Sequence, residues 1–158
     1  MRADHKNSIW RFASAVFAII LAASGAFAAD DSPNATGTAF EYPAGPPAEI
    51  ARAFVAAFNA GDESAMADFC TTHQSETALE ERSLKSQLYQ FGGLCRMLGT
   101  ISPFSVTDRS SSKIVLLVRS EKLGTWFNVG VEMDKNQAGK ASHVYVRPAP
   151  PPEMIGRS

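Results

Sequence analysis

Apolar residues recur with a helical period shortly after residue 47. Ile50, Phe54 and Phe58 are spaced four residues apart, which places them on one face of a helix. Gly61 follows this stripe, and glycine is the residue that most often closes a helix in the left-handed conformation. The pattern predicts an amphipathic helix that ends at Gly61.

Two further helices are expected before any strand begins. Asp62 is a typical N-cap for a short second helix. A third helix is predicted from about residue 75 to residue 90, ended by Gly92 and Gly93. The inward-facing apolar residues are Met66, Phe69 and Cys70 on the second helix, and Leu84, Leu88 and Phe91 on the third.

The second half of the chain alternates with the period of β-strands. Strands are predicted over residues 113–119, 125–133 and 143–147, with two shorter ones over 94–101 and 104–108. Three helices followed by a meander of strands describe an α+β domain with helices packed on one face of the sheet. The face toward the helices is predicted to hold Ile114, Leu116, Val118, Phe127, Val129, Val131, Met133, Val144 and Val146.

The first thirty residues have the features of a secretory signal peptide. Basic residues precede an apolar run over residues 12–23, and Ala26 and Ala28 supply small side chains at the positions of a cleavage site. We expect cleavage after Ala28, no lipid anchor because no cysteine follows the site, and a periplasmic or secreted protein. The alternative is an uncleaved anchor, for which residues 12–29 barely reach the minimum spanning length.

Proline-rich segments flank the predicted domain. Residues 1–28 form the signal peptide, and residues 29–47 are expected to be a flexible lead-in rich in proline and glycine. Residues 148–158 form a proline-rich tail, because prolines stop the last strand. The folded domain therefore spans residues 48–147.

Composition excludes several classes of function. The 158-residue chain is 45% hydrophobic and 20% charged, with a net charge of -1, so it has no basic surface for nucleic acid. The sequence holds no nucleophile elbow, glycine-rich phosphate loop or compact zinc motif. We expect no cofactor, no metal and, after cleavage of the signal peptide, no membrane association.

The order of the elements and three short segments resemble the NTF2-like (SnoaL-like) superfamily. The segment over residues 54–62 is similar to the junction between two helices in such domains. Residues 91–94 and 144–150 are similar to the small NTF2-like module found beside secreted serine hydrolase and β-lactamase-like domains. The resemblance implies a cone, with three N-terminal helices on one face of a curved, mainly antiparallel sheet. We expect the module to stand alone here, without hydrolytic activity.

The resemblance also raises two roles for the interior of the cone. A small apolar ligand is expected to contact Phe54, Phe58, Met66, Leu116, Phe127, Val129 and Val131. An isomerase or lyase needs a titratable group there, and the weak candidates are Asp68, His73 and Tyr89 at the mouth of the cone. The alternative is that Asp68 and His73 are solvated and Tyr89 is half-buried.

The two cysteines of the mature chain form one candidate pair. Cys70 and Cys95 are both predicted to point inward, and the exported compartment can oxidise thiols. We predict a disulfide that closes a loop of about 25 residues and contributes roughly 3 kcal/mol. The alternative is two buried free thiols that pack as small hydrophobic groups.

The outer face of the predicted sheet has the composition of an interface. Alternation places apolar, aromatic and arginine side chains together on that face. The candidate interface residues are Val115, Leu117, Arg119, Trp126, Asn128, Tyr145 and Arg147. A terminal segment that folds over the patch is the alternative covering.

The sequence therefore favours an exported, non-catalytic module. It is expected to bind a second copy of itself, a protein partner or a small apolar ligand. The alternatives are a small isomerase or lyase, and an accessory subunit of a separately encoded hydrolase.

Overall fold

The computed structural model describes residues 40–155 of the chain. The predicted signal peptide, residues 29–39 of the lead-in and residues 156–158 of the tail lie outside this part. The helices are α1 (Pro46–Ala60), α2 (Glu63–His73), α3 (Glu76–Glu81), α4 (Leu84–Leu98) and the one-turn α5 (Pro152–Ile155). The strands are β1 (Ile101–Arg109), β2 (Lys113–Ser120), β3 (Trp126–Met133) and β4 (Ala141–Pro148). None of the helices in the described range is long and apolar enough to cross a membrane.

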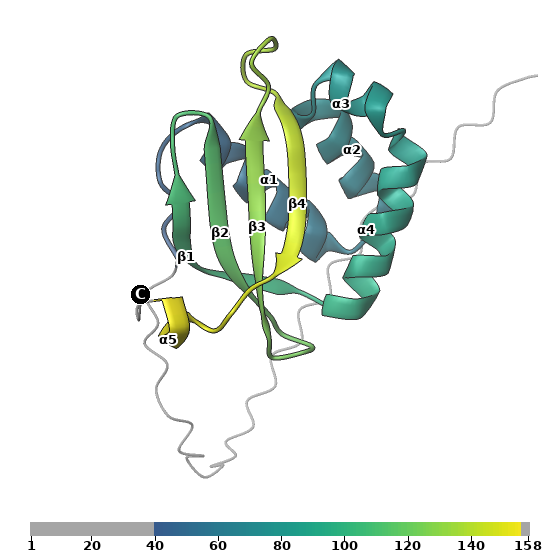
Figure 1. Ribbon diagram of the computed structural model, residues 1–158. Helices are drawn as coiled ribbons and strands as arrows, with labels where there is room; N and C mark the ends of the chain where they lie inside the picture. Colours follow the sequence, from purple (N-terminus) through teal and green to yellow (C-terminus); the bar gives the residue numbers. More distant parts are fainter. Residues whose placement is uncertain (1–39, 156–158) are drawn as a thin grey trace, which may run out of the picture. The chain divides into compact units, whose positions relative to one another are not determined.

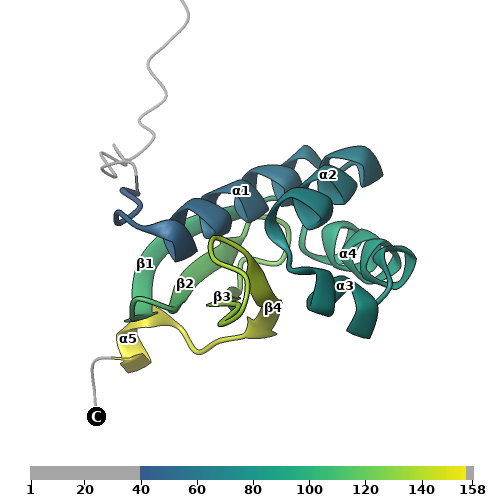
Figure 2. The same ribbon diagram turned by 90° about the horizontal axis from the view of Figure 1, so that it is seen from above.

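The strands form one antiparallel sheet in the order β1-β2-β3-β4. α1 lies behind the sheet in Figure 1, α2, α3 and α4 stand toward its β4 edge, and α5 lies on the opposite side of the sheet from α1 in Figure 2. Across the sheet, Leu116 pairs with Val129, which in turn pairs with Val146. This register puts the predicted apolar residues of β2, β3 and β4 on one face, so the α+β class is confirmed.

The predicted end of α1 and the predicted start of α2 are confirmed. Gly61 has φ 71° and donates its backbone N–H to Phe58 O at 3.1 Å, which closes α1. The Asp62 carboxylate then accepts a hydrogen bond from Ala65 N at 2.7 Å and caps α2. α1 itself begins at Pro46, two residues before the predicted start of the domain.

The prediction of one helix over residues 75–90 is wrong. The chain forms α3 and α4 instead, because the backbone is extended at Arg82 and Ser83. The Ser83 hydroxyl accepts a hydrogen bond from Ser86 N at 3.4 Å and so begins α4 as a separate helix.

The prediction that a strand follows Gly92 and Gly93 is also wrong. Both glycines lie inside α4, and the first strand begins only at Ile101. Phe91 and Leu98 are buried seven residues apart on one face of α4. Their helical spacing and burial outweigh the poor helix propensity of the two glycines.

Phe54 occupies the centre of the helical layer. Its side chain is fully buried, and its ring lies 5.8 Å from Phe58, 5.4 Å from Phe69 and 5.3 Å from Phe91, measured between ring centroids. Because these rings belong to α1, α2 and α4, one aromatic cluster joins the three helices. The opposite side of the cluster meets the buried aliphatic residues of β2 and β3.

Asn59 ties the end of α1 to the start of the sheet. Its side-chain Nδ2 donates to Ile101 O at 2.9 Å, and its Oδ1 accepts from Ile101 N at 2.8 Å. The side-chain amide thus pairs with the Ile101 backbone in the way that a residue of a neighbouring strand would. This asparagine lies in the helix junction that carried the resemblance, and here its role is structural.

We expect Asn59→Ala to lower the free energy of unfolding by about 2 kcal/mol, because two hydrogen bonds are lost at the buried Ile101 backbone. Chemical denaturation of the purified domain measures the change. Asn59→Asp keeps the acceptor but sets a carboxylate oxygen against Ile101 O in place of the donor, so it should not restore the lost stability. Equal stability of wild type and Asn59→Ala would contradict this role.

Candidate functional site

The predicted catalytic candidates do not form one cluster. Asp68 and His73 line a shallow groove of about 450 Å³ between α1 and α2, whose other lining residues are mostly alanines. Tyr89 lines a different groove between α2 and α4. It is also 81% exposed, so the interpretation that it is half-buried is wrong.

The surroundings of His73 favour the neutral form of its imidazole. Its ring lies 5.3 Å from the Phe69 ring, and partial burial lowers its pKa, with a further contribution from the positive charge of Lys140. The Lys140 ammonium itself donates to Thr72 O at 2.5 Å at the end of α2. These contacts fix the helix end and position no second catalytic group beside the imidazole.

The lowered pKa predicts a pH-dependent stability. The pKa of His73 in the folded protein lies below its unfolded pKa near 6.5. The contribution of His73 to stability is therefore complete above pH 6.5 and is lost as pH falls from there through the folded pKa. The melting temperature should decrease as the pH is lowered from about 7.5 to about 5.5. His73→Gln cannot titrate and should show a smaller fall; an equally steep fall would assign the effect to other groups.

The seven predicted cavity residues pack against one another in the core. All of them are at most 8% exposed and belong to one apolar cluster: Phe54, Phe58, Met66, Leu116, Phe127, Val129 and Val131. Met66 also lines the groove between α2 and α4 that Tyr89 borders. The layer between helices and sheet is therefore built of contacts between side chains.

The buried polar groups of the described part are uncharged. They are Gln74, Ser75, Gln87 and Ser120. Gln74 and Gln87 exchange two hydrogen bonds of 2.8 Å, and the Ser120 hydroxyl donates to Leu98 O at 2.6 Å. These groups join α2 to α4, and α4 to β2. Within residues 40–155, no three His, Cys, Asp or Glu side chains gather closely enough to hold a metal ion.

The predicted disulfide is absent from the structure, in which Cys70 and Cys95 are free thiols. Cys70 is fully buried, and burial raises the pKa of its thiol to about 11. The Cys95 thiol points to the end of α1 and donates to Phe58 O at 3.7 Å, and burial raises its pKa as well. The alternative of two free thiols that pack as small groups describes this arrangement.

We expect a thiol reagent to titrate two thiols per chain after denaturation without reductant. In the native protein at mildly alkaline pH both should react slowly, because their raised pKa values leave little thiolate. Absorbance of the released chromophore measures both stages. No reactive thiol after denaturation would show that the bridge forms after all.

The predicted interface residues share the outer face of the sheet. Strand pairing arranges them in rows: Val115 with Gly130 and Tyr145, Leu117 with Asn128 and Arg147, and Arg119 with Trp126. Val115 and Leu117 are 7% and 0% exposed although they face away from the helices. A second, thin apolar layer therefore lies on this face.

The Tyr145 ring covers that apolar layer at Gly130. A Cβ at Gly130 would overlap the Tyr145 ring, so glycine is needed for the ring to lie across β3. Arg147 stacks on the same ring, with its guanidinium carbon 4.5 Å from the ring centroid. The result is a flat surface of aromatic and guanidinium groups over the strands.

Phe104 is a surface residue that strand alternation missed. The pairing of β1 with β2 shifts between Pro103 and Ser105, and this bulge leaves Phe104 55% exposed. Its ring meets the Trp126 ring edge-on, with centroids 5.0 Å apart. A proline followed by an aromatic residue in a strand is the sequence signal that could have revealed it.

The C-terminal tail occupies part of the same side. Ala149 N donates to Trp126 O at 2.9 Å, and α5 follows on the side away from α1 (Figure 2). This bond continues the pairing of β3 with β4 and holds the start of the tail at the Trp126 end of the face, whereas residues 29–39 of the lead-in lie outside the described residues. Phe104, Arg119 and Arg147 stay exposed.

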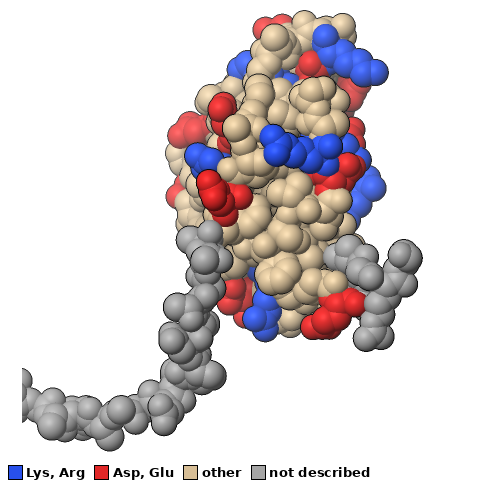
Figure 3. All heavy atoms as spheres, turned by 90° about the vertical axis from the view of Figure 1, so that its left-hand side faces the viewer, with Lys and Arg blue, Asp and Glu red and all other residues tan. Residues whose placement is uncertain are grey.

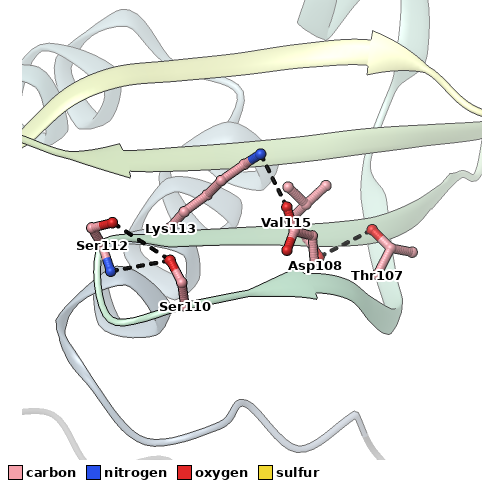
Figure 4. Close-up of polar contacts among 6 residues, drawn as sticks. All are labelled: Thr107, Asp108, Ser110, Ser112, Lys113 and Val115. Atoms are coloured by element: carbon pink, nitrogen blue, oxygen red, sulfur yellow. Dashed lines mark hydrogen bonds and ion pairs between the residues drawn. The ribbon is translucent and has the colours of Figure 1, made fainter.

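Polar contacts order the other end of the outer face. Lys113 Nζ lies 3.0 Å from the Asp108 carboxylate, and the Thr107 hydroxyl donates to Val115 O at 3.3 Å (Figure 4). The hydrogen bond and charge of Asp108 raise the pKa of Lys113. At the β1 edge, charges of both signs are scattered over the surface (Figure 3). Pro103 and the bulges of β1 disfavour addition of another strand there.

No model of a known protein family matches the chain, and comparison with curated proteins and with solved structures finds no significant similarity.

Proposed function

We propose that the protein is an exported, non-catalytic binding module that pairs with a second copy of itself through the outer face of its sheet. The observation that carries the proposal is the surface formed by Phe104, Trp126, Tyr145 and the two arginines beside them. Aromatic residues and arginine are the types most enriched at the centres of protein interfaces. Export rests on the N-terminal sequence pattern.

The charges of the outer face suit a second copy. Arg119 lies next to Trp126 at one end of the face, and Glu132 lies at the other end, six residues further along β3. Lys113 already pairs with Asp108, and no residue in the described range forms an ion pair with Glu132. A two-fold axis running across the strands would bring Arg119 of each copy to Glu132 of the other.

Asn128 supports a role for this face that is independent of folding. It lies between Leu117 and Arg147, and its side-chain oxygen is buried with no hydrogen-bond partner in the described part of the chain. Such a group costs about 1–3 kcal/mol, and β-branched residues suit a strand better. Local features that weaken a fold are expected where a surface has another use.

The NTF2-like architecture is part of the same proposal. It is supported by the order of the elements, with the helices from α1 to α4 preceding an antiparallel sheet and α1 packing on one of its faces. The filled interior favours binding at the surface over a ligand within the cone.

The test is the native mass of the exported chain, which begins at Ala29. We expect assembly in the wild type and a smaller mass in Trp126→Asp through loss of the outer-face contact, because a charge at the centre of an apolar contact opposes association. Since Trp126 also contacts the tail, Phe104→Asp serves as a second variant at a more exposed position.

Leu123→Asp is the matched control. Leu123 is 45% exposed in the turn between β2 and β3, so the same change of charge is made outside the strands. It should leave the assembly intact. A wild-type mass equal to that of a single chain, or assembly unchanged in both face variants, would overturn the proposed function.

A further inference from the structure

A groove between α2 and α4 forms a separate apolar surface. Its volume is about 490 Å³, and its floor is built of Met66, Leu88, Phe91 and Cys95. α4 stands beside α2 at the β4 side of the sheet (Figures 1 and 2), and its C-terminal end reaches β2, where the Ser120 hydroxyl donates to Leu98 O. The residues that line the groove are not those of the outer face, so the two surfaces share no side chain.

Tyr89 stands on the wall of this groove and is 81% exposed. It is the most exposed large hydrophobic residue of the described part. An aromatic side chain beside a hollow of apolar residues is a self-complementary arrangement, because each of two copies offers both a ring and a place to receive one.

The middle of α4 is shaped for close approach. Gly92 lines the groove, and a Cβ at Gly93 would meet no atom within 4 Å. Packing within one chain therefore does not require a glycine at position 93, which is unfavourable in a helix interior. Glycines at a crossing let two helices approach each other closely.

The two walls of the groove carry opposite charges, which suit a second copy of the chain. Asp62 and Glu63 lie on the α2 side, whereas Lys85 and Arg96 lie on the α4 side. All four side chains are exposed, and none of them forms an ion pair within residues 40–155. Another α4 entering the groove would bring its own basic residues to the acidic wall.

We propose that a second copy of the chain binds at this groove, with Tyr89 of each copy inserted into the groove of the other. α4 then crosses its symmetry mate near Gly93, and Lys85 and Arg96 of each copy face Asp62 and Glu63 of the other. Residues 29–39, which contain no aromatic or large aliphatic residue, offer nothing to fill the groove. A contact based on one helix lies at the lower end of interface sizes, so the affinity is weak.

The contact is independent of the outer-face dimer, and the two together build an assembly larger than a dimer. Sedimentation over about a hundred-fold range of concentration separates them. We expect wild type to exceed a dimer, Tyr89→Asp and Trp126→Asp each to stop at a dimer, and the double variant to be monomeric. Tyr89→Asp should weaken the groove contact by roughly thirty-fold or more.

Three controls keep the interpretation specific. Leu123→Asp should match wild type, and Tyr89→Phe should keep the assembly because the ring remains. Glu63→Lys and Lys85→Glu should each weaken the groove contact, whereas the variant carrying both should regain it. A purely structural role of these exposed residues would not produce that rescue.

The outcomes distinguish the two proposals. If Tyr89→Asp assembles as wild type does, the groove contact is overturned while the outer-face dimer stands. If Tyr89→Asp alone yields monomers and Trp126→Asp changes nothing, the groove contact stands and the outer-face dimer is overturned. A wild type that stays monomeric over the whole range overturns both.

Discussion

The fold depends on the contact of Phe54 with three other phenylalanine rings. Because those rings come from α1, α2 and α4, the cluster holds the helical layer together and sets its distance from the sheet. The same rings, with the aliphatic residues of β2 and β3, fill the volume that a ligand within a cone would need. The binding surfaces that we propose therefore lie on the outside of the molecule.

A domain of about a hundred residues cannot cover all of its apolar surfaces with its own chain. The helices cover one face of the sheet, and the other face keeps a thin layer closed by Tyr145 and the tail. α4 has three buried residues out of fifteen, since it packs on α1 and α2 at the margin of the sheet. The two proposed contacts lie at these two incompletely covered places.

Strand register was predictable because alternation over eight residues is a strong signal. The same signal failed at Phe104, where a bulge in β1 adds a residue and breaks the period of two. Helix ends were predictable where a side chain caps the helix, as at Asp62, but glycine in α4 was mistaken for an end. The predicted disulfide is not formed in the structure: the face on which a cysteine lies does not determine the partner of its thiol, and the Cys95 thiol donates a hydrogen bond to Phe58 O at the end of α1.

Two residues that the rules of strand and helix propensity disfavour at their positions support the proposed contacts. Asn128 is a polar residue in a central strand, and its buried side-chain oxygen has no hydrogen-bond partner among residues 40–155; Gly93 is a helix-interior glycine that no neighbour in the same range requires. By contrast, Gly130 and Asn59 break the same rules for reasons that lie within the chain, namely the Tyr145 ring and the Ile101 backbone. Where no contact among the described residues explains such an exception, we attribute it to a contact with another molecule. Asn128 and Gly93 both lie where a second copy is proposed to bind.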